Sequence, residues 1–315
     1  MRALIIQSLL ALSLLSSVRG NSLTDSSVAE KACWLDPSPS PDKQRTRILT
    51  IGLGSLYVGS MTWLYHEWYR DYPLGNFRTF NDGSEWEGMD KFAHGWDAYS
   101  ISKPVFRLFR WAGYDNNRAA WMGAGVAFLF QTTVEVFDGF SPGWGFSTYD
   151  LAANTAGTAL FLSQQLGWQE QRIVLKYSLR TTPYAAYRPE LLGSSVPERI
   201  LKDYNGLTFW ASVSPSTFLR GTNVKWPAWL SLAVGFGAEG MTGGANNPTE
   251  VNGSPIPSFE RYRQYYLGLD FDLARIQTRH RWLSDIFKLI NIVHLPAPAL
   301  ELSPGRRPKW HALYF

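Results

Sequence analysis

The order of apolar and charged residues divides the chain into a helical first half and a second half with shorter repeats. Three stretches carry no charged residue and are long enough to form helices, and a fourth, more polar stretch contains Pro104. Because the connections between them are short, the pattern predicts a bundle of about four apolar helices. The four stretches run over Ile48–Tyr65, Met89–Trp111, Ala119–Val134 and Leu151–Trp168.

The pattern of apolar and polar residues changes after about residue 200. Residues 230–237 and 267–273 alternate large apolar side chains with small or polar ones, which is typical of strands. Residues 281–294 predict one amphipathic helix, and the Gly-, Asn- and Pro-rich residues 243–257 predict a loop. The fold class is therefore expected to be mainly α, with a smaller α+β region that holds a few antiparallel strands.

The N-terminus has the features of an export signal. A basic Arg2 is followed by an apolar segment and by small residues ending at Gly20, a run too short to span a bilayer comfortably. This pattern predicts a protein exported to the bacterial cell envelope. The expected organisation is a signal peptide at 1–20, a flexible leader at 21–46, the helical bundle at 47–170 and a C-terminal region at 171–315.

The sequence leaves the membrane topology open. Ile48–Tyr65 is just long enough for a transmembrane helix, and its glycines, Gly52, Gly54 and Gly59, would allow close helix approach. Basic residues stand directly before this run, however, and basic flanks normally stay on the cytoplasmic side. Membrane lipid is the expected partner, but inner membrane, periplasm and outer membrane all remain compatible with the pattern. Whether the signal is cleaved is not determined.

Composition narrows the class of protein. Aromatic residues make up 15% of the chain and include 14 Trp, which suits either a membrane interface or a large aromatic core. The net charge of +4 is not concentrated in a basic block, so no nucleic-acid partner is predicted. No protein partner or oligomeric state is identified. Cys33 is the single cysteine, and the charged residues before it argue against a lipid anchor.

Ionisable residues recur at helical spacing within the apolar stretches. Asp90 and His94 lie at i and i+4, Glu135 and Asp138 at i and i+3, and Asp150 and Asn154 again at i and i+4. Polar groups inside apolar helices are costly unless they face one another, a metal or water. We therefore predict one polar cluster at one end of the bundle, made of Asp90, Lys91, His94, Glu135, Asp138, Asp150 and Asn154.

Three interpretations of this cluster stay open. It can be a structural or ligand-binding network in which Lys91 neutralises an acid. It can be an acid/base site, with His94, Glu135, Asp138 and Asp150 as catalytic candidates of an envelope hydrolase acting on lipid or cell-wall material. It can also hold a divalent metal, although no cofactor is predicted firmly. The sequence does not decide whether the protein is an enzyme.

The motifs resemble a known family. Asp90-Lys91-x-x-His94, Glu135-x-x-Asp138-Gly139 and Asp150-Leu151-x-x-Asn154-x-x-Gly157 are similar to those of the YfiM-like family of predicted periplasmic lipoproteins, a domain of unknown function. A more distant likeness is to VanZ-like membrane proteins. The resemblance covers about residues 85–165, and residues 202–206 resemble the extended C-terminal half of longer members. It implies a periplasmic or envelope address and supplies no reaction.

Overall fold

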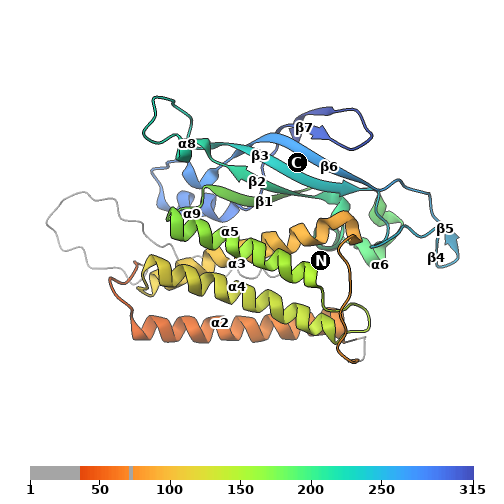
Figure 1. Ribbon diagram of the computed structural model, residues 1–315, viewed down its shortest axis with the longest axis horizontal. Helices are drawn as coiled ribbons and strands as arrows, with labels where there is room; N and C mark the ends of the chain where they lie inside the picture. The colour runs from red at the N-terminus through yellow and green to blue at the C-terminus, as the bar shows by residue number, and fades with distance from the viewer. Residues whose placement is uncertain (1–35, 71–73) are drawn as a thin grey trace.

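The first half of the protein is built from four long helices (Figure 1). The computed structural model describes residues 36–70 and 74–315, so the predicted signal peptide, most of the predicted leader and Cys33 lie outside the described residues. The helices are α2 (Lys43–Leu64), α3 (Met89–Trp111), α4 (Asn116–Gly139) and α5 (Thr148–Gly167). All four fall on the stretches that the apolar pattern marked.

Capping residues explain where these helices begin. Asp42, Asp115 and Ser147 each accept a hydrogen bond from a backbone amide three residues further on, which satisfies an otherwise unpaired donor of the first turn. The cap at Asp42 starts α2 at Lys43, so the last residues of the predicted leader are helical. Pro104 lies within α3 and does not end it.

Small residues bring α3, α4 and α5 close together. A side chain at Gly157 of α5 would place its Cβ 2.0 Å from the carbonyl oxygen of Gly95 on α3, so only glycine fits there. A Cβ at Gly123 of α4 would lie 2.8 Å from the carbonyl oxygen of Ser102. By contrast, the three glycines of α2 that were expected to admit a neighbouring helix have nothing within 4 Å of that position.

A six-stranded antiparallel sheet follows the helices, in the order β1-β2-β3-β6-β7-β8. A helical region followed by an α+β region is thus confirmed, with more strands than the few that were expected. Two further strands, β4 (Glu250–Val251) and β5 (Ser254–Pro255), form a small hairpin within the predicted loop. The sheet strands are β1 (Ile173–Leu179), β2 (Leu207–Val213), β3 (Leu230–Glu239), β6 (Tyr262–Phe271), β7 (Ala297–Leu302) and β8 (Lys309–Tyr314).

Three of these strands lack a clear sequence signal, each for a physical reason. Strand β1 carries Lys176 on its buried side, which disguises the alternation. Strand β2 is buried on both faces along residues 207–210, so its side chains do not alternate in polarity. Strand β7 contains Pro298, and proline argues against a strand because it has no backbone N–H to donate to a neighbouring strand.

The sheet curls until its two ends approach each other. The Tyr314 hydroxyl of β8 lies 3.0 Å from the Thr208 hydroxyl of β2, although three strands separate β2 from β8 in the sheet order. The residues before β7 pair with β1, where the His294 amide donates to the Tyr177 carbonyl at 2.8 Å. The curl encloses one face of the sheet.

Short elements connect and cover these two parts. The predicted amphipathic helix is α9 (Arg281–Ile290), which ends four residues before the expected end. The others are η1 (Tyr65–Tyr69), η2 (Glu85–Gly88), η3 (Tyr184–Ala186), α6 (Pro189–Leu192), α7 (Val196–Lys202), η4 (Tyr204–Gly206), α8 (Pro215–Phe218) and η5 (Leu273–Arg275).

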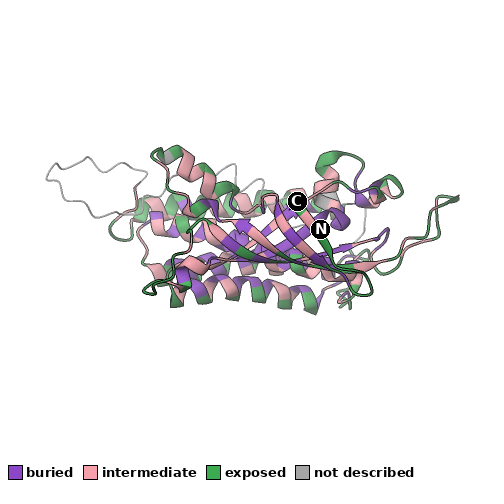
Figure 2. Cartoon of the chain, turned by 90° about the horizontal axis from the view of Figure 1, so that it is seen from above, coloured by how far each residue is buried: buried purple, intermediate pink, exposed green. Residues whose placement is uncertain are grey.

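Helix α3 joins the bundle to the sheet through a shared core. Trp96 of α3 is 2% exposed, and its ring lies 4.7 Å from that of Tyr177 on β1 and 6.3 Å from that of Phe209 on β2. Figure 2 shows buried residues concentrated along the middle of the sheet and on the inward turns of the helices. The two parts therefore pack on each other around α3.

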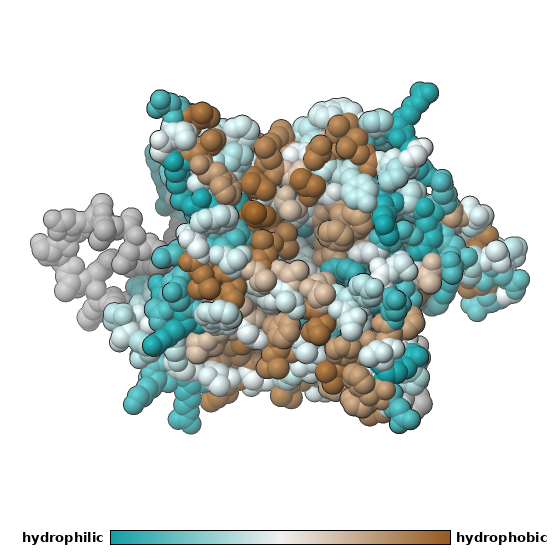
Figure 3. All heavy atoms as spheres, in the orientation of Figure 1, coloured by the Kyte–Doolittle hydropathy of each residue, from teal (hydrophilic) through white to brown (hydrophobic). Residues whose placement is uncertain are grey.

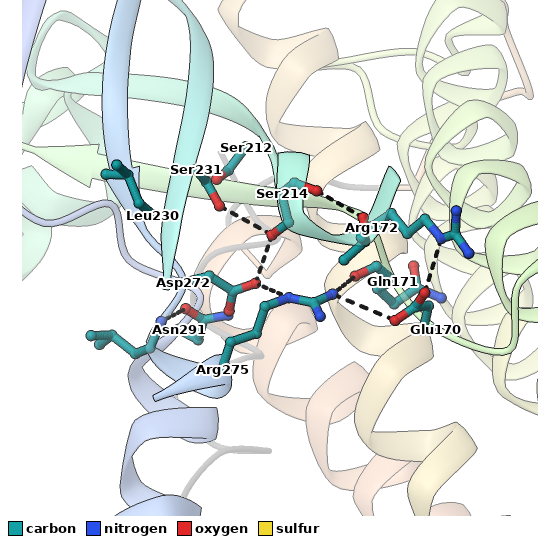
Figure 4. Close-up of polar contacts among 12 residues, drawn as sticks. Glu170, Gln171, Arg172, Ser212, Ser214, Leu230, Ser231, Asp272, Arg275 and Asn291 are labelled. Atoms are coloured by element: carbon teal, nitrogen blue, oxygen red, sulfur yellow. Dashed lines mark hydrogen bonds and ion pairs between the residues drawn. The ribbon is translucent and has the colours of Figure 1, made fainter. Parts of the chain in front are cut away.

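A polar network fastens the far end of the same junction (Figure 4). Arg275, which follows strand β6, donates to Asp272 at 2.8 Å and to the Gln171 carbonyl at 3.2 Å. Asp272 also accepts a hydrogen bond from Ser214 at 3.1 Å. The network connects the α5–β1 linker with the ends of β2 and β6.

Among the described residues, one helix is both long and apolar enough to cross a membrane. It is α4, not the predicted α2, and 44% of its apolar window is buried within the protein. A single such helix is also typical of the core of a soluble protein, so its length and composition alone leave the topology open.

Candidate functional site: the Asp90–His94–Asp150 cluster

Three helices bring the predicted polar residues to one end of the bundle. Helix α3 supplies Asp90 and His94 from its first turns, α4 supplies Glu135 from its last turns, and α5 supplies Asp150 and Asn154 from its first turns. Because α3 and α5 both begin at the end of the bundle where α4 ends, the polar side chains of the three helices meet in one interior region. His94, Glu135, Asp150 and Asn154 are all buried.

Asn154 sets the orientation of the His94 ring. The Asn154 side-chain oxygen lies 3.2 Å from Nδ1 of His94 and also accepts from Gln131 at 3.4 Å. Because an amide oxygen can only accept, Nδ1 carries the proton and Nε2 keeps its lone pair. That nitrogen lies 3.9 Å from Oδ1 of Asp90 and 3.8 Å from Oδ2 of Asp150.

Lys91 holds the other sides of the same carboxylates. Its ammonium lies 3.0 Å from Oδ2 of Asp90, 2.7 Å from Oδ1 of Asp150 and 2.6 Å from Oδ2 of Asp82. Burial lowers the pKa of Lys91, but the neighbouring carboxylates outweigh it and raise that pKa, so the ammonium stays charged. Asp90 and Asp150 therefore each turn one oxygen to Lys91 and the other to His94.

Burial keeps protons on the remaining acids near neutral pH. It raises the pKa of Glu135 to about 7 and that of Asp150 to about 8, even though Lys91 contacts Asp150. The Lys91 charge is shared among three carboxylates, which is why burial prevails at Asp150. Burial also lowers the pKa of His94, which favours the neutral ring. The cluster thus contains groups that gain and lose protons in the physiological range.

Further residues that the sequence pattern missed complete the site. The Tyr204 hydroxyl of η4 donates to Oδ1 of Asp90 at 2.6 Å, across 114 positions of sequence. The Ser147 hydroxyl donates to Asp82 at 2.5 Å and accepts from the Asp150 amide at 3.0 Å. No helical spacing marks Asp82 or Tyr204, since one lies in a loop and the other in the distant C-terminal half.

Asp138 is placed differently from the other predicted residues. It is buried one helical turn beyond Glu135, and its Oδ1 accepts from the Tyr69 hydroxyl at 2.8 Å. This contact joins α4 to η1, at the end of α2. The structure brings together Asp90, Lys91, His94, Glu135, Asp150 and Asn154, and it directs Asp138 toward the helix on the other side of α4.

The geometry suits a cation better than a nucleophile. Ligand atoms of Asp90, His94 and Asp150 all lie within 4.8 Å of one another. Neighbouring ligands around a tetrahedral ion bound at 2.0–2.2 Å stand roughly 3.3–3.6 Å apart, so the widest of these separations would have to shorten by about 1.2–1.5 Å to close the site. Ser147 is engaged by Asp82 rather than His94, and among the described residues no hydroxyl forms a hydrogen bond with the His94 ring.

The comparisons with known proteins agree with an envelope protein that carries this cluster. Residues 78–164 match a family described as predicted periplasmic lipoprotein (DUF2279), and the match contains the cluster residues of α3, α4 and α5. No curated protein and no solved structure matches the chain. The match supports an exported bacterial envelope protein, as the N-terminal pattern predicts. The YfiM-like name and the VanZ-like likeness stay predictions.

Proposed function

We propose that the protein is an exported, membrane-associated protein of the bacterial envelope that binds one divalent cation between Asp90, His94 and Asp150. The observation that carries the proposal is the position of Nε2 of His94, which lies 3.9 Å from Oδ1 of Asp90 and 3.8 Å from Oδ2 of Asp150. Imidazole nitrogen and carboxylate oxygen are ligands that Zn²⁺ and Mn²⁺ accept.

The surrounding residues have the roles that a cation site requires. Asn154 fixes the ring through the Nδ1 proton, the arrangement that orients most metal-binding histidines. Lys91 and Tyr204 position Asp90, and Lys91 and the capping hydroxyl of Ser147 position Asp150. Glu135 approaches Nδ1 of His94 at 3.6 Å with an oxygen, Oε1, that accepts no hydrogen bond.

Isothermal titration of the purified full chain with Zn²⁺ and with Mn²⁺ tests the proposal. We expect one ion per chain, together with proton release that is visible as a dependence of the heat on the buffer. His94→Ala should abolish this binding, whereas His280→Ala, which removes an exposed histidine, should leave it unchanged. Equal binding by wild type and His94→Ala, or no binding by the folded wild type, would contradict the proposal.

A second function rests on the same residues. The pKa values of Glu135 and Asp150, about 7 and about 8, suit proton transfer at neutral pH, with His94 within 4 Å of both carboxylates. We propose acid/base hydrolysis of envelope lipid or cell-wall material as the alternative. It is supported if metal-free protein turns over lipid or peptidoglycan fragments and Glu135→Gln stops this at unchanged protein stability. No turnover by the wild type counts against it.

A further inference from the structure

The curled sheet has its polarity reversed relative to a sheet in water. Its enclosed face carries charged and hydroxyl side chains beside an aromatic cluster of Trp210, Tyr266 and Tyr314, whereas a soluble sheet would bury mainly apolar ones. Lys176 and Asp270 form an ion pair of 2.7 Å there with both side chains 0% exposed, and Ser212 donates to the same carboxylate. Other buried polar residues of this face are Ser178, Thr208, Ser231, Gln264 and Glu301.

The opposite face is apolar, and the helices cover only the part of it over β1, β2 and the end of β3, where Phe92 of α3 stacks on Phe236. Beyond this covered part the strand register aligns large apolar residues in rows across β3, β6, β7 and β8. Val234 pairs with Leu267, which pairs with Leu300, which pairs with Trp310. Exposed fractions are 55% for Val234, 51% for Leu267 and 65% for Trp310. The outer sheet face is defined here as Leu232, Val234, Tyr265, Leu267, Leu302, Trp310 and Leu313, all exposed.

This surface is continuous and is bordered by charge. Figure 3 shows hydrophobic residues over the sheet and over the helices below it, with hydrophilic residues gathered toward the two ends of the molecule. Exposed Arg307 lies in the turn between β7 and β8, shortly before the exposed Trp310, whereas Lys309 pairs with Glu301 and so lies on the other face of the sheet. An aromatic ring close to a basic residue at the edge of an apolar surface is typical of proteins that rest on anionic membranes.

We propose that the outer sheet face docks into the acyl chains of an envelope membrane, with Arg307 against anionic headgroups. The inference rests on the membrane association proposed above and names the surface responsible for it. Reversed alternation, polar inside and apolar outside, is what hydrocarbon selects in a sheet. Strand β8 ends the sheet order, and its outer backbone groups need water, so the sheet lies at the interface and does not span the bilayer.

Vesicle flotation of the full chain tests this surface. The vesicles contain phosphatidylethanolamine and anionic phosphatidylglycerol. The variant Val234→Lys/Leu267→Glu replaces a directly paired, exposed couple with an opposite-charge pair that the sheet tolerates. The matched control, Ile51→Lys/Val58→Glu, makes the same charge change on two exposed residues of α2. We expect wild type and control to float and the sheet variant to lose at least about tenfold in vesicle binding, the effect of 1.4 kcal/mol.

The outcomes separate this inference from the proposed association. A wild type that does not float overturns both. A wild type and sheet variant that float equally, with the α2 variant left behind, overturn the sheet surface and keep the association. A sheet variant that becomes monomeric from a dimer but floats unchanged assigns the face to a second copy and overturns the proposal. If circular dichroism shows that the double variant is unfolded, Leu313→Lys at the end of β8 takes its place and is judged by the same outcomes.

Discussion

At the scale of single residues, the cluster is a competition between burial and charge. Lys91 pairs with three carboxylates, but Asp150 and Glu135 still hold protons because both are almost fully enclosed. A cation bound between Asp90, His94 and Asp150 would displace these protons, so proton binding and metal binding are coupled in the cluster. The stability of the folded protein is therefore expected to depend on pH.

Asp150→Asn should remove part of that dependence. The pKa of Asp150 is raised from an ordinary 3.8 to about 8, so between these values the folded chain keeps a proton that the unfolded chain loses. Its contribution to stability is therefore present below about pH 4 and is lost as pH rises to about 8, by about 1.4 kcal/mol per pH unit. The stability of Asp150→Asn relative to wild type should rise across this window in urea titrations.

The control for this experiment is Asp115→Asn, on the exposed N-cap of α4, where asparagine caps as well as aspartate. It should follow the wild-type pH profile from pH 5 upward. Parallel profiles for Asp150→Asn and wild type from pH 4 to 8 would show that the Asp150 carboxyl is ionised throughout.

At the scale of elements, the bundle depends on how closely α3 and α5 approach. Gly157 follows Asn154 by one turn, and its backbone rests against Gly95, one residue after His94. The same close contact that packs the helices therefore also sets the distance between His94 and Asn154. The motif that ends at Gly157 therefore contains Asn154, which orients the His94 ring, and a glycine whose missing side chain lets the two helices approach.

Gly157→Ala should separate the two helices. Its Cβ would stand 2.0 Å from a backbone oxygen that cannot rotate away, so we expect a loss of about 1–3 kcal/mol in the free energy of unfolding and weaker cation binding. Gly125→Ala in α4 is the control, since nothing lies within 4 Å of its Cβ, and helix propensity alone should stabilise it by up to about 1 kcal/mol. Denaturant unfolding measures both, and equal effects would contradict the packing argument.

At the scale of the whole molecule, bundle and sheet share the core around α3. Trp96 packs against both β1 and β2, while Tyr204 reaches back from η4 to Asp90. The cluster is consequently closed by the C-terminal half, and the sheet is held at a fixed place on the bundle. The helices and the sheet are expected to unfold together.

Trp96→Ala should test this coupling. Removing a fully buried indole between the two parts should cost about 3–5 kcal/mol and lower the stability of helices and sheet alike. Trp121→Ala, which removes a ring that is 61% exposed on α4, should change stability by less than about 0.5 kcal/mol. Far-ultraviolet circular dichroism and tryptophan fluorescence should give one coincident transition for each protein. Separate transitions in the wild type would mean that the two parts fold independently.

Local patterns were enough to predict the helices and most of the cluster. Charge-free stretches marked three of the four long helices, because apolar length and spacing are properties of a short segment. The i, i+4 spacings of Asp90 with His94 and of Asp150 with Asn154 predicted shared helix faces for the same reason. The alternation in residues 230–237 and 267–273 likewise predicted β3 and β6.

Only the tertiary structure decided the rest, because it depends on contacts between distant segments. Tyr204 and Asp82 join the site through contacts that no local spacing encodes, and Asp138 leaves it because helix rotation turns its carboxylate to Tyr69. The strand register alone aligns the exposed rows of the outer sheet face, and the curl alone buries Lys176 with Asp270. The sequence by itself thus determined an exported chain with apolar helices and an acid–histidine set, whereas the tertiary structure decided which of those residues meet and which sheet face stays exposed.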